Sequence, residues 1–96
     1  MKEYVVYILT NYDNSVFYTG ITNNLKRRIW EHQNKANPDS FTGKYKVYKL
    51  VWFHSFPSPE EAIVMEKRVK GWVRAKKIKL ITSKNPNYQD LTLRNV

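Results

Sequence analysis

Hydrophobic positions near the start of the chain come in two short runs that are separated by a polar turn. Residues 4–9 form a continuous run of β-branched, aromatic and aliphatic side chains, which is typical of a strand covered on both faces. Residues 11–15 are turn formers and residues 16–21 return to strand composition, so the pattern predicts a β-hairpin. Gly20, near the end of the second strand, predicts either a bend or a close approach of the backbone to another group.

A helical pattern follows the hairpin. Thr-Asn-Asn at residues 22–24 offers N-cap side chains, so we predict a helix that begins near Leu25. Its inner face should hold Leu25 and Ile29, followed by either His32 or Gln33, because residues three and four apart lie on one face.

The second half of the chain predicts one strand and two helices. Residues 34–44 are polar and contain proline and glycine, which predicts a loop, and residues 45–56 have the composition of the longest strand. Ser-Pro-Glu-Glu at residues 58–61 is typical of a helix start, and Gly71 should interrupt the helix before a last one over about residues 73–82. The residues expected to face the core from these helices and the following tail are Ala62, Met65, Val69, Val73, Ile78, Leu80, Ile81, Tyr88 and Leu91.

The element order ββαβαα predicts an α/β (α+β) fold, with a small antiparallel or mixed sheet of three strands flanked by helices. A chain of 96 residues makes one domain with one modest core. We expect this domain to cover residues 1–83, and residues 84–96 to form an irregular tail that packs on it or extends from it.

The net charge of the chain indicates what kind of partner it binds. Seventeen Lys and Arg against eight Asp and Glu give a net charge of +9, which favours a polyanion such as nucleic acid, although a lysine-rich protein without such a partner remains an alternative. The absence of cysteine excludes disulfides, thiolate metal sites and cysteine nucleophiles. The first residues offer no signal-peptide core and no apolar run approaches the ~20 residues of a membrane span, so we expect a cytoplasmic protein without membrane association.

Four residues of the first half are candidates for phosphate chemistry. Tyr7 and Tyr18 lie on the two predicted strands, and Arg28 and His32 share a face of the first helix. A guanidinium matches two phosphate oxygens in a way that an ammonium does not. Taken singly, the tyrosines would be core aromatics, the arginine part of a solvated face and the histidine structural.

Glu66 is the acidic residue of a strongly basic stretch. It could bind a divalent metal ion, or it could merely pair with Lys70, four positions later on the same helix. No cluster of Asp and Glu predicts a site for two metal ions.

Taken together, these segments resemble the GIY-YIG nuclease superfamily. The matching pieces are Val-Val-Tyr at residues 5–7, Tyr-Thr-Gly at 18–20, Leu-Lys-Arg-Arg-Ile-Trp-Glu-His at 25–32, and the helix over 62–72. The sequence looks most like the small stand-alone bacterial members, which resemble the nuclease half of nucleotide-excision repair enzymes and some homing endonucleases. Each motif alone is weak, whereas their order and spacing over roughly residues 4–81 are specific.

The resemblance implies a three-stranded antiparallel sheet and cleavage of DNA with one divalent ion, Mg²⁺ or Mn²⁺. Two positions depart from the namesake motif, because Val5 replaces its first glycine and Thr19 its central isoleucine, but neither position supplies a reacting group. The catalytic residues carried over by position are Tyr7, Tyr18, Arg28, His32 and Glu66.

The implied roles follow the needs of phosphodiester hydrolysis. Glu66 would bind the metal ion largely through water, and Arg28 would hold the scissile phosphate. Either Tyr7 or Tyr18, with its pKa lowered from about 10 by nearby cations, would accept the proton of the attacking water. His32 would shuttle that proton or hydrogen-bond the phosphate.

A dense basic segment over residues 67–79 predicts a track for the phosphate backbone. Tyr45 is a further candidate contact at the edge of this track. Trp72 is expected to pack in the core, whereas Trp30 could either pack there or stack on a base. The side chains expected to contact nucleic acid are Arg27, Lys44, Lys67, Lys70, Arg74, Lys76 and Lys77.

We therefore predict a metal-dependent endonuclease that hydrolyses DNA in repair, recombination or degradation, with branched and single-stranded DNA among its candidate substrates. A catalytically inactive nucleic-acid-binding module of the same fold is the main alternative, and a protein-interaction domain is the third. The sequence indicates no oligomeric state.

Overall fold

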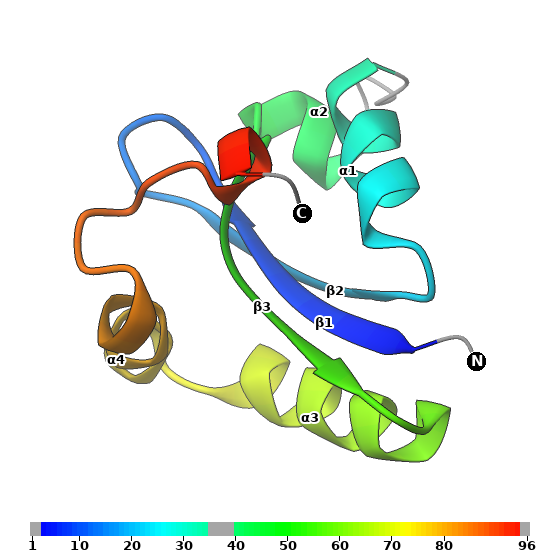
Figure 1. The fold of residues 1–96 in the computed structure, drawn as a ribbon. Coiled ribbons are helices and arrows are strands. Elements are labelled where there is room, and N and C mark those ends of the chain that lie inside the picture. Colours follow the sequence, from blue (N-terminus) through cyan, green and yellow to red (C-terminus); the bar gives the residue numbers. More distant parts are fainter. Residues whose placement is uncertain (1–2, 35–39, 95–96) are drawn as a thin grey trace.

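The protein is built around a three-stranded sheet that has helices on both faces (Figure 1). A computed structural model describes residues 3–34 and 40–94. The strands are β1 (Tyr4–Thr10), β2 (Phe17–Thr22) and β3 (Lys49–Phe56), and the helices are α1 (Leu25–Asn34), α2 (Phe41–Tyr45), α3 (Pro59–Gly71), α4 (Arg74–Lys84) and the 3₁₀ turn η1 (Leu91–Arg94). No helix in the described ranges has the length and apolar character needed to cross a membrane.

The sheet has the order β2-β1-β3, and β1 is antiparallel to both neighbours. The predicted hairpin and the predicted fold class are therefore confirmed, with an antiparallel rather than a mixed sheet. In the hairpin register Tyr7 lies opposite Gly20, and Leu9 lies opposite Tyr18. Side chains alternate between the faces of a strand, so both tyrosines project from the same face of the sheet.

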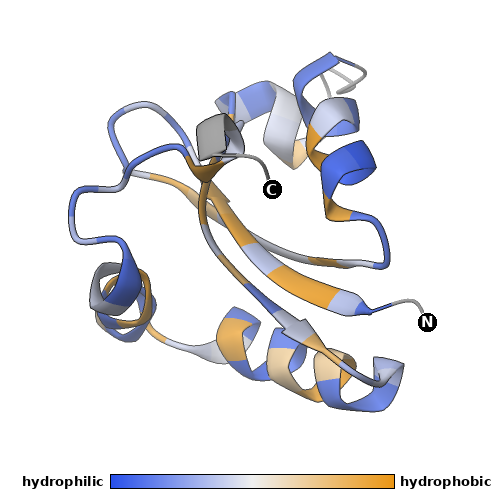
Figure 2. Ribbon diagram, viewed as in Figure 1, coloured by the Kyte–Doolittle hydropathy of each residue, from blue (hydrophilic) through white to orange (hydrophobic). Residues whose placement is uncertain are grey.

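Two hydrophobic cores form instead of the one modest core that was predicted, because β1 is covered on both sides, as its uninterrupted apolar run predicts. Val5, Tyr7 and Leu9 belong to the first core, which lies between the sheet and α1. Val6 and Ile8 belong to the second core, which lies between the sheet and helices α3 and α4. All five side chains are buried, and the central strand is correspondingly the most hydrophobic element in Figure 2.

The helix starts follow their capping residues. The Asn24 side chain accepts a hydrogen bond from the Arg27 amide at 3.1 Å, and the predicted first helix begins at Leu25. The Ser58 hydroxyl accepts from the Glu61 amide at 3.3 Å and returns a bond to the Glu61 carboxylate, and α3 begins with a proline. Gly71 is the last residue of α3, in agreement with the predicted interruption.

Two predictions for the middle of the chain were wrong. The predicted loop over residues 34–44 contains α2, which is capped by Ser40, although residues 35–39 of that loop lie outside the described part of the chain. The third strand begins at Lys49 rather than at residue 45, because Lys46 closes α2 in the left-handed region with φ 54°. A left-handed residue cannot continue into a strand.

The C-terminal half departs from prediction at Val73, which is 72% exposed because it is the N-cap of α4 rather than a core residue. Beyond α4 the chain returns along β3, with Tyr88 packed against the second core and Leu91 against the first, as predicted. Asn85 donates to Val51 O at 3.0 Å, and Asp90 accepts from Leu50 N at 3.3 Å. The 3₁₀ turn η1 interrupts a tail that was predicted to be irregular.

Candidate active site

The centre of the site is Tyr7, which the middle strand holds against the backbone of β2. A Cβ atom added at Gly20 would lie 2.5 Å from Tyr7 Cζ and nearer still to Oη. Glycine is therefore required opposite this tyrosine, which confirms the predicted close approach of the backbone. The Tyr7 ring is 1% exposed, and packing fixes the place of its hydroxyl.

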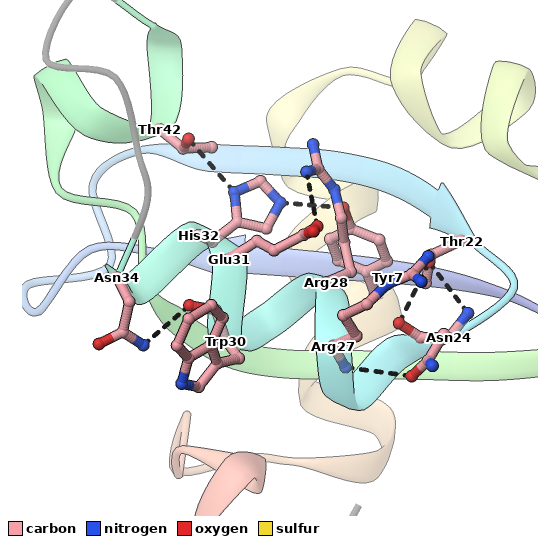
Figure 3. A network of polar contacts seen from close by, with 10 residues as sticks. All are labelled: Tyr7, Thr22, Asn24, Arg27, Arg28, Trp30, Glu31, His32, Asn34 and Thr42. Carbon is pink, nitrogen blue, oxygen red and sulfur yellow. Dashed lines mark hydrogen bonds and ion pairs between the residues drawn. The ribbon is translucent and has the colours of Figure 1, made fainter.

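His32 comes to Tyr7 from α1, and it is His32 rather than Gln33 that faces inward (Figure 3). Tyr7 Oη and His32 Nε2 are 3.0 Å apart. On the opposite side of the imidazole, Nδ1 lies 3.2 Å from Thr42 Oγ1 of α2. The His32 side chain is buried, so both ring nitrogens find their partners within the protein.

The charge states of this pair are set by burial. Desolvation, assisted by the nearby Arg28 cation, lowers the pKa of His32 from 6.5 to about 4. Desolvation also raises the pKa of Tyr7 from 10.0 to about 12, so the prediction of a lowered tyrosine pKa was wrong for Tyr7: burial outweighs the lowering effect of Arg28. At neutral pH the imidazole is neutral and the phenol is protonated. Because a neutral imidazole has one donor and one acceptor, one of its two hydroxyl partners donates to the ring and the other accepts from it.

Arg28 lies one helical turn before His32 and carries the positive charge of the site. Its guanidinium is 3.4 Å from the Glu31 carboxylate and also interacts with the hydroxyls of Tyr7 and Tyr18. Partial burial opposes its charge, but these three interactions outweigh burial and raise the pKa of Arg28. The Arg28 side chain remains 42% exposed, so a ligand in solvent can reach its guanidinium.

Tyr18 completes the group of rings. Its centroid lies 6.3 Å from that of Tyr7 and 5.4 Å from that of His32, with an interplanar angle of 64° to the imidazole. The structure thus brings together four of the five residues predicted to be catalytic, from β1, β2 and α1.

The fifth, Glu66, comes from α3, on the other side of the sheet from α1, and it pairs with Lys70 of the same helix. Its carboxylate pairs with Lys70 Nζ at 2.5 Å, and the Glu66 side chain is only 12% exposed. The hydrogen bond that Lys70 donates to Glu66 raises the pKa of Lys70, and the charge interaction with Tyr18 acts in the same direction. The predicted alternative for Glu66, an ion pair with Lys70, is therefore present.

The side chains around Glu66 could hold a metal ion only if water supplied most of its ligands. Within residues 3–34 and 40–94, no group of three or more His, Cys, Asp and Glu side chains could enclose a metal ion. One carboxylate can still hold Mg²⁺ or Mn²⁺ when water supplies the remaining ligands. The Lys70 ammonium shows that the position accepts a cation.

The residues predicted to contact nucleic acid come from four helices, α1 to α4. Arg27 lies exposed on α1, Lys44 on α2, and Lys67 with Lys70 on α3. The guanidinium of Arg74 already has partners within the protein. It donates hydrogen bonds to the carbonyls of Ser15 and Asn14, both at 2.8 Å, and lies 4.6 Å from the centroid of the Phe17 ring.

The basic residues of α4 continue beyond Arg74. Lys76 Nζ lies 4.4 Å from the centroid of the Trp72 ring, and Lys77 is partly buried. Trp72 packs against the second core, as predicted. Trp30 is 51% exposed on α1.

Sequence reasoning missed two residues that contact the predicted set. Glu31 pairs with Arg28, and the spacing of three on a helix could have indicated it. Thr42 holds His32, but it lies in a helix of five residues that has no periodic signal.

A three-stranded antiparallel sheet whose two tyrosines meet an arginine and a histidine of the following helix defines a GIY-YIG nuclease domain. The chain belongs to this family, since residues 3–79 match the profile of the GIY-YIG catalytic domain. Domains of this family are typically nucleases, and nucleic acid is their substrate.

Among curated proteins the chain is similar to small proteins that share the name UPF0213. The one from Clostridium perfringens is 42% identical over 80 residues, which cover 83% of this chain and 84% of the relative. The one from Halalkalibacterium halodurans is 38% identical over 92 residues, covering 96% and 95%. A solution NMR structure of a UPF0213 protein from Bacillus halodurans has a TM-score of 0.58 and 37% identity, and covers 100% of this chain and 99% of that one.

Proposed function

We propose that this protein is a metal-dependent endonuclease that hydrolyses DNA phosphodiester bonds in repair, recombination or degradation. The observation that carries the proposal is the hydrogen bond of 3.0 Å between Tyr7 and a neutral His32, directly beside the Arg28 guanidinium, in a domain of a nuclease family. A buried structural tyrosine needs one hydrogen-bond partner for its hydroxyl, but it does not need a phosphate-matching cation as well.

Arg28 holds the scissile phosphate. Its guanidinium matches two phosphate oxygens and stays charged throughout. The buried Tyr7 hydroxyl becomes accessible when the Arg28 side chain, which now interacts with it, turns from the tyrosine to the phosphate. Substrate binding would thus place the phosphorus next to the base.

Tyr7 is the base because His32 can take its proton. As water attacks phosphorus, Tyr7 Oη takes the proton of the water while the phenolic proton passes to His32 Nε2. This transfer requires the tautomer in which Nδ1 bears the ring proton and donates to Thr42 Oγ1. The new P–O bond forms as the bond to the leaving oxygen breaks; that oxygen keeps the electron pair and takes a proton from solvent.

Glu66 would hold the Mg²⁺ or Mn²⁺ ion, which supplies Lewis-acid stabilisation of charge on the phosphate and the leaving oxygen when bound. Lys70 must release the carboxylate for this to happen, because its ammonium already pairs with it. The same ion pair is the observation that favours the second candidate, a nucleic-acid-binding module without catalysis, in which Lys70 keeps Glu66 permanently neutralised.

Cleavage assays decide between the two candidates. Branched, single-stranded and duplex DNA are incubated with the protein and Mg²⁺ or Mn²⁺, alongside Tyr7→Phe, Glu66→Gln and the control Glu60→Gln, an exposed carboxylate on the same helix. We expect the first two variants to lose roughly 100-fold or more in rate and Glu60→Gln to keep its activity. Mn²⁺ binding, followed by paramagnetic relaxation, should weaken in Glu66→Gln alone.

Binding without cleavage on every substrate would establish the binding module. Cleavage that survives equally in Tyr7→Phe and Glu66→Gln would show that the activity arises elsewhere.

A further inference from the structure

Two exposed aromatic rings adjoin the candidate active site on α2. Phe41 is 46% exposed and Tyr45 is 44% exposed, with ring centroids 5.0 Å apart. Neither ring is among the side chains packed against the two hydrophobic cores in the described part of the chain. Core packing therefore does not account for two large apolar rings at this surface.

These rings extend the buried group of the active site to the surface. The Phe41 centroid lies 6.1 Å from that of Tyr18, at an interplanar angle of 33°, and Tyr18 in turn contacts Tyr7 and His32. A continuous file of rings thus runs from the proposed base outward to Tyr45. A strand whose phosphate reaches Arg28 would pass its neighbouring nucleotides over this file.

The charge around the rings suits a nucleic-acid strand. Lys44 Nζ lies 5.6 Å from the centroid of the Tyr45 ring, and α2 contains no acidic residue. Arg28 interacts with Tyr18 at the inner end of the file. Cations beside exposed aromatic rings are the combination with which proteins bind single strands, because the rings stack on bases while the cations neutralise phosphates.

We propose that Phe41 and Tyr45 form a stacking surface for unpaired bases next to the scissile phosphate, so that the enzyme acts on single-stranded DNA or on single-stranded segments of branched DNA. The bases of an intact duplex are stacked on one another and offer no free face to these rings. This inference rests on the proposed function, because it assigns a substrate class to the same site.

The test measures affinity separately from cleavage. Fluorescence anisotropy in EDTA at one fixed salt concentration compares a single-stranded oligonucleotide with its duplex for Phe41→Ala, Phe41→Leu and Tyr45→Ala. Tyr12→Ala is the control, since Tyr12 is an aromatic residue that is 89% exposed and belongs to the hairpin loop rather than to α2. Far-ultraviolet circular dichroism confirms that each variant is folded.

We expect each α2 variant to weaken single-strand binding by roughly 5- to 100-fold, with little change for duplex and none in Tyr12→Ala. Phe41→Leu keeps an apolar side chain but has no aromatic face, so it should resemble Phe41→Ala. Unchanged single-strand affinity in the α2 variants, or equal losses for single strand and duplex, would overturn the stacking surface.

The stacking surface and the nuclease can fail independently. Single-strand binding that depends on Phe41 and Tyr45 but is never followed by cleavage would retain the surface and refute the nuclease. Cleavage of duplex DNA that depends on Tyr7 and Glu66, with no effect of the α2 variants, would retain the nuclease and refute the surface.

Discussion

The buried His32 should make the protein lose stability as the pH falls below neutrality. Folding lowers the pKa of its imidazole from 6.5 to about 4, so between these values the unfolded chain binds a proton that the folded chain does not. The stabilisation is fully present above pH 6.5 and is lost as the pH falls towards 4. At about 1.4 kcal/mol per pH unit, the loss reaches up to about 3 kcal/mol, a large part of the stability of a small domain.

Urea unfolding at pH values from 7.5 to about 4 measures this loss. Acidic side chains also titrate at the lower end, so the informative quantity is the difference in slope between the parent protein and His32→Gln, which lacks the titrating ring. His54→Gln is the matched control, because it removes the second histidine, which is exposed on β3. NMR titration of the imidazole resonances gives the pKa of His32 directly.

We expect the parent and His54→Gln to lose stability with the same slope between pH 6.5 and 4, and His32→Gln to lose less. Parallel curves for all three proteins, or a His32 midpoint near its ordinary value, would show that the imidazole is not desolvated as its contacts indicate.

Three further substitutions test other contacts. Gly20→Ala should force the Tyr7 ring away from β2, which would cost about 1–3 kcal/mol in urea unfolding and reduce cleavage; unchanged stability and activity would contradict the close packing. Arg28→Lys keeps the charge but loses the fork, so cleavage should fall by roughly 100-fold while the melting temperature changes little; full activity would exclude bidentate phosphate binding. Asn85→Ala should cost about 2–3 kcal/mol, because Val51 O and the backbone of Gln89 lose a buried partner; a loss below ~0.5 kcal/mol would show that water replaces the amide.

The hairpin and the helix boundaries could be predicted because their signals are local. The uninterrupted apolar run of β1 indicates a strand covered on both faces, and Ser58 with Pro59 indicates the start of α3. Helix α2 could not be predicted, since one turn of helix has no measurable periodicity. It is held by the tertiary contact of Thr42 with His32 and by a local bond at its end, in which the Val47 amide donates to Thr42 O.

The residues of the site could be predicted from the sequence, but several of the contacts that hold them in place could not. The spacing of Arg28 and His32 places them on one helical face, and their meeting with Tyr7 follows from packing α1 on the sheet. The sequence contains no signal that Thr42 would hold the imidazole. The engagement of Arg74 with two carbonyls of the hairpin loop likewise depends on how α4 lies beside the sheet, which composition does not specify.

The contacts of Asn85 and Asp90 with β3 also bear on how the protein behaves in concentrated solution. β3 borders the sheet, and a bordering strand with open amides and carbonyls invites strands from other molecules. The Asn85 side chain donates a hydrogen bond to the carbonyl of Val51, and the Asp90 side chain accepts one from the amide of Leu50. These two backbone groups are therefore not available to pair with a strand of another molecule. The C-terminal segment therefore protects the sheet from self-association, and a chain shortened at Lys84 should form aggregates that the full chain avoids.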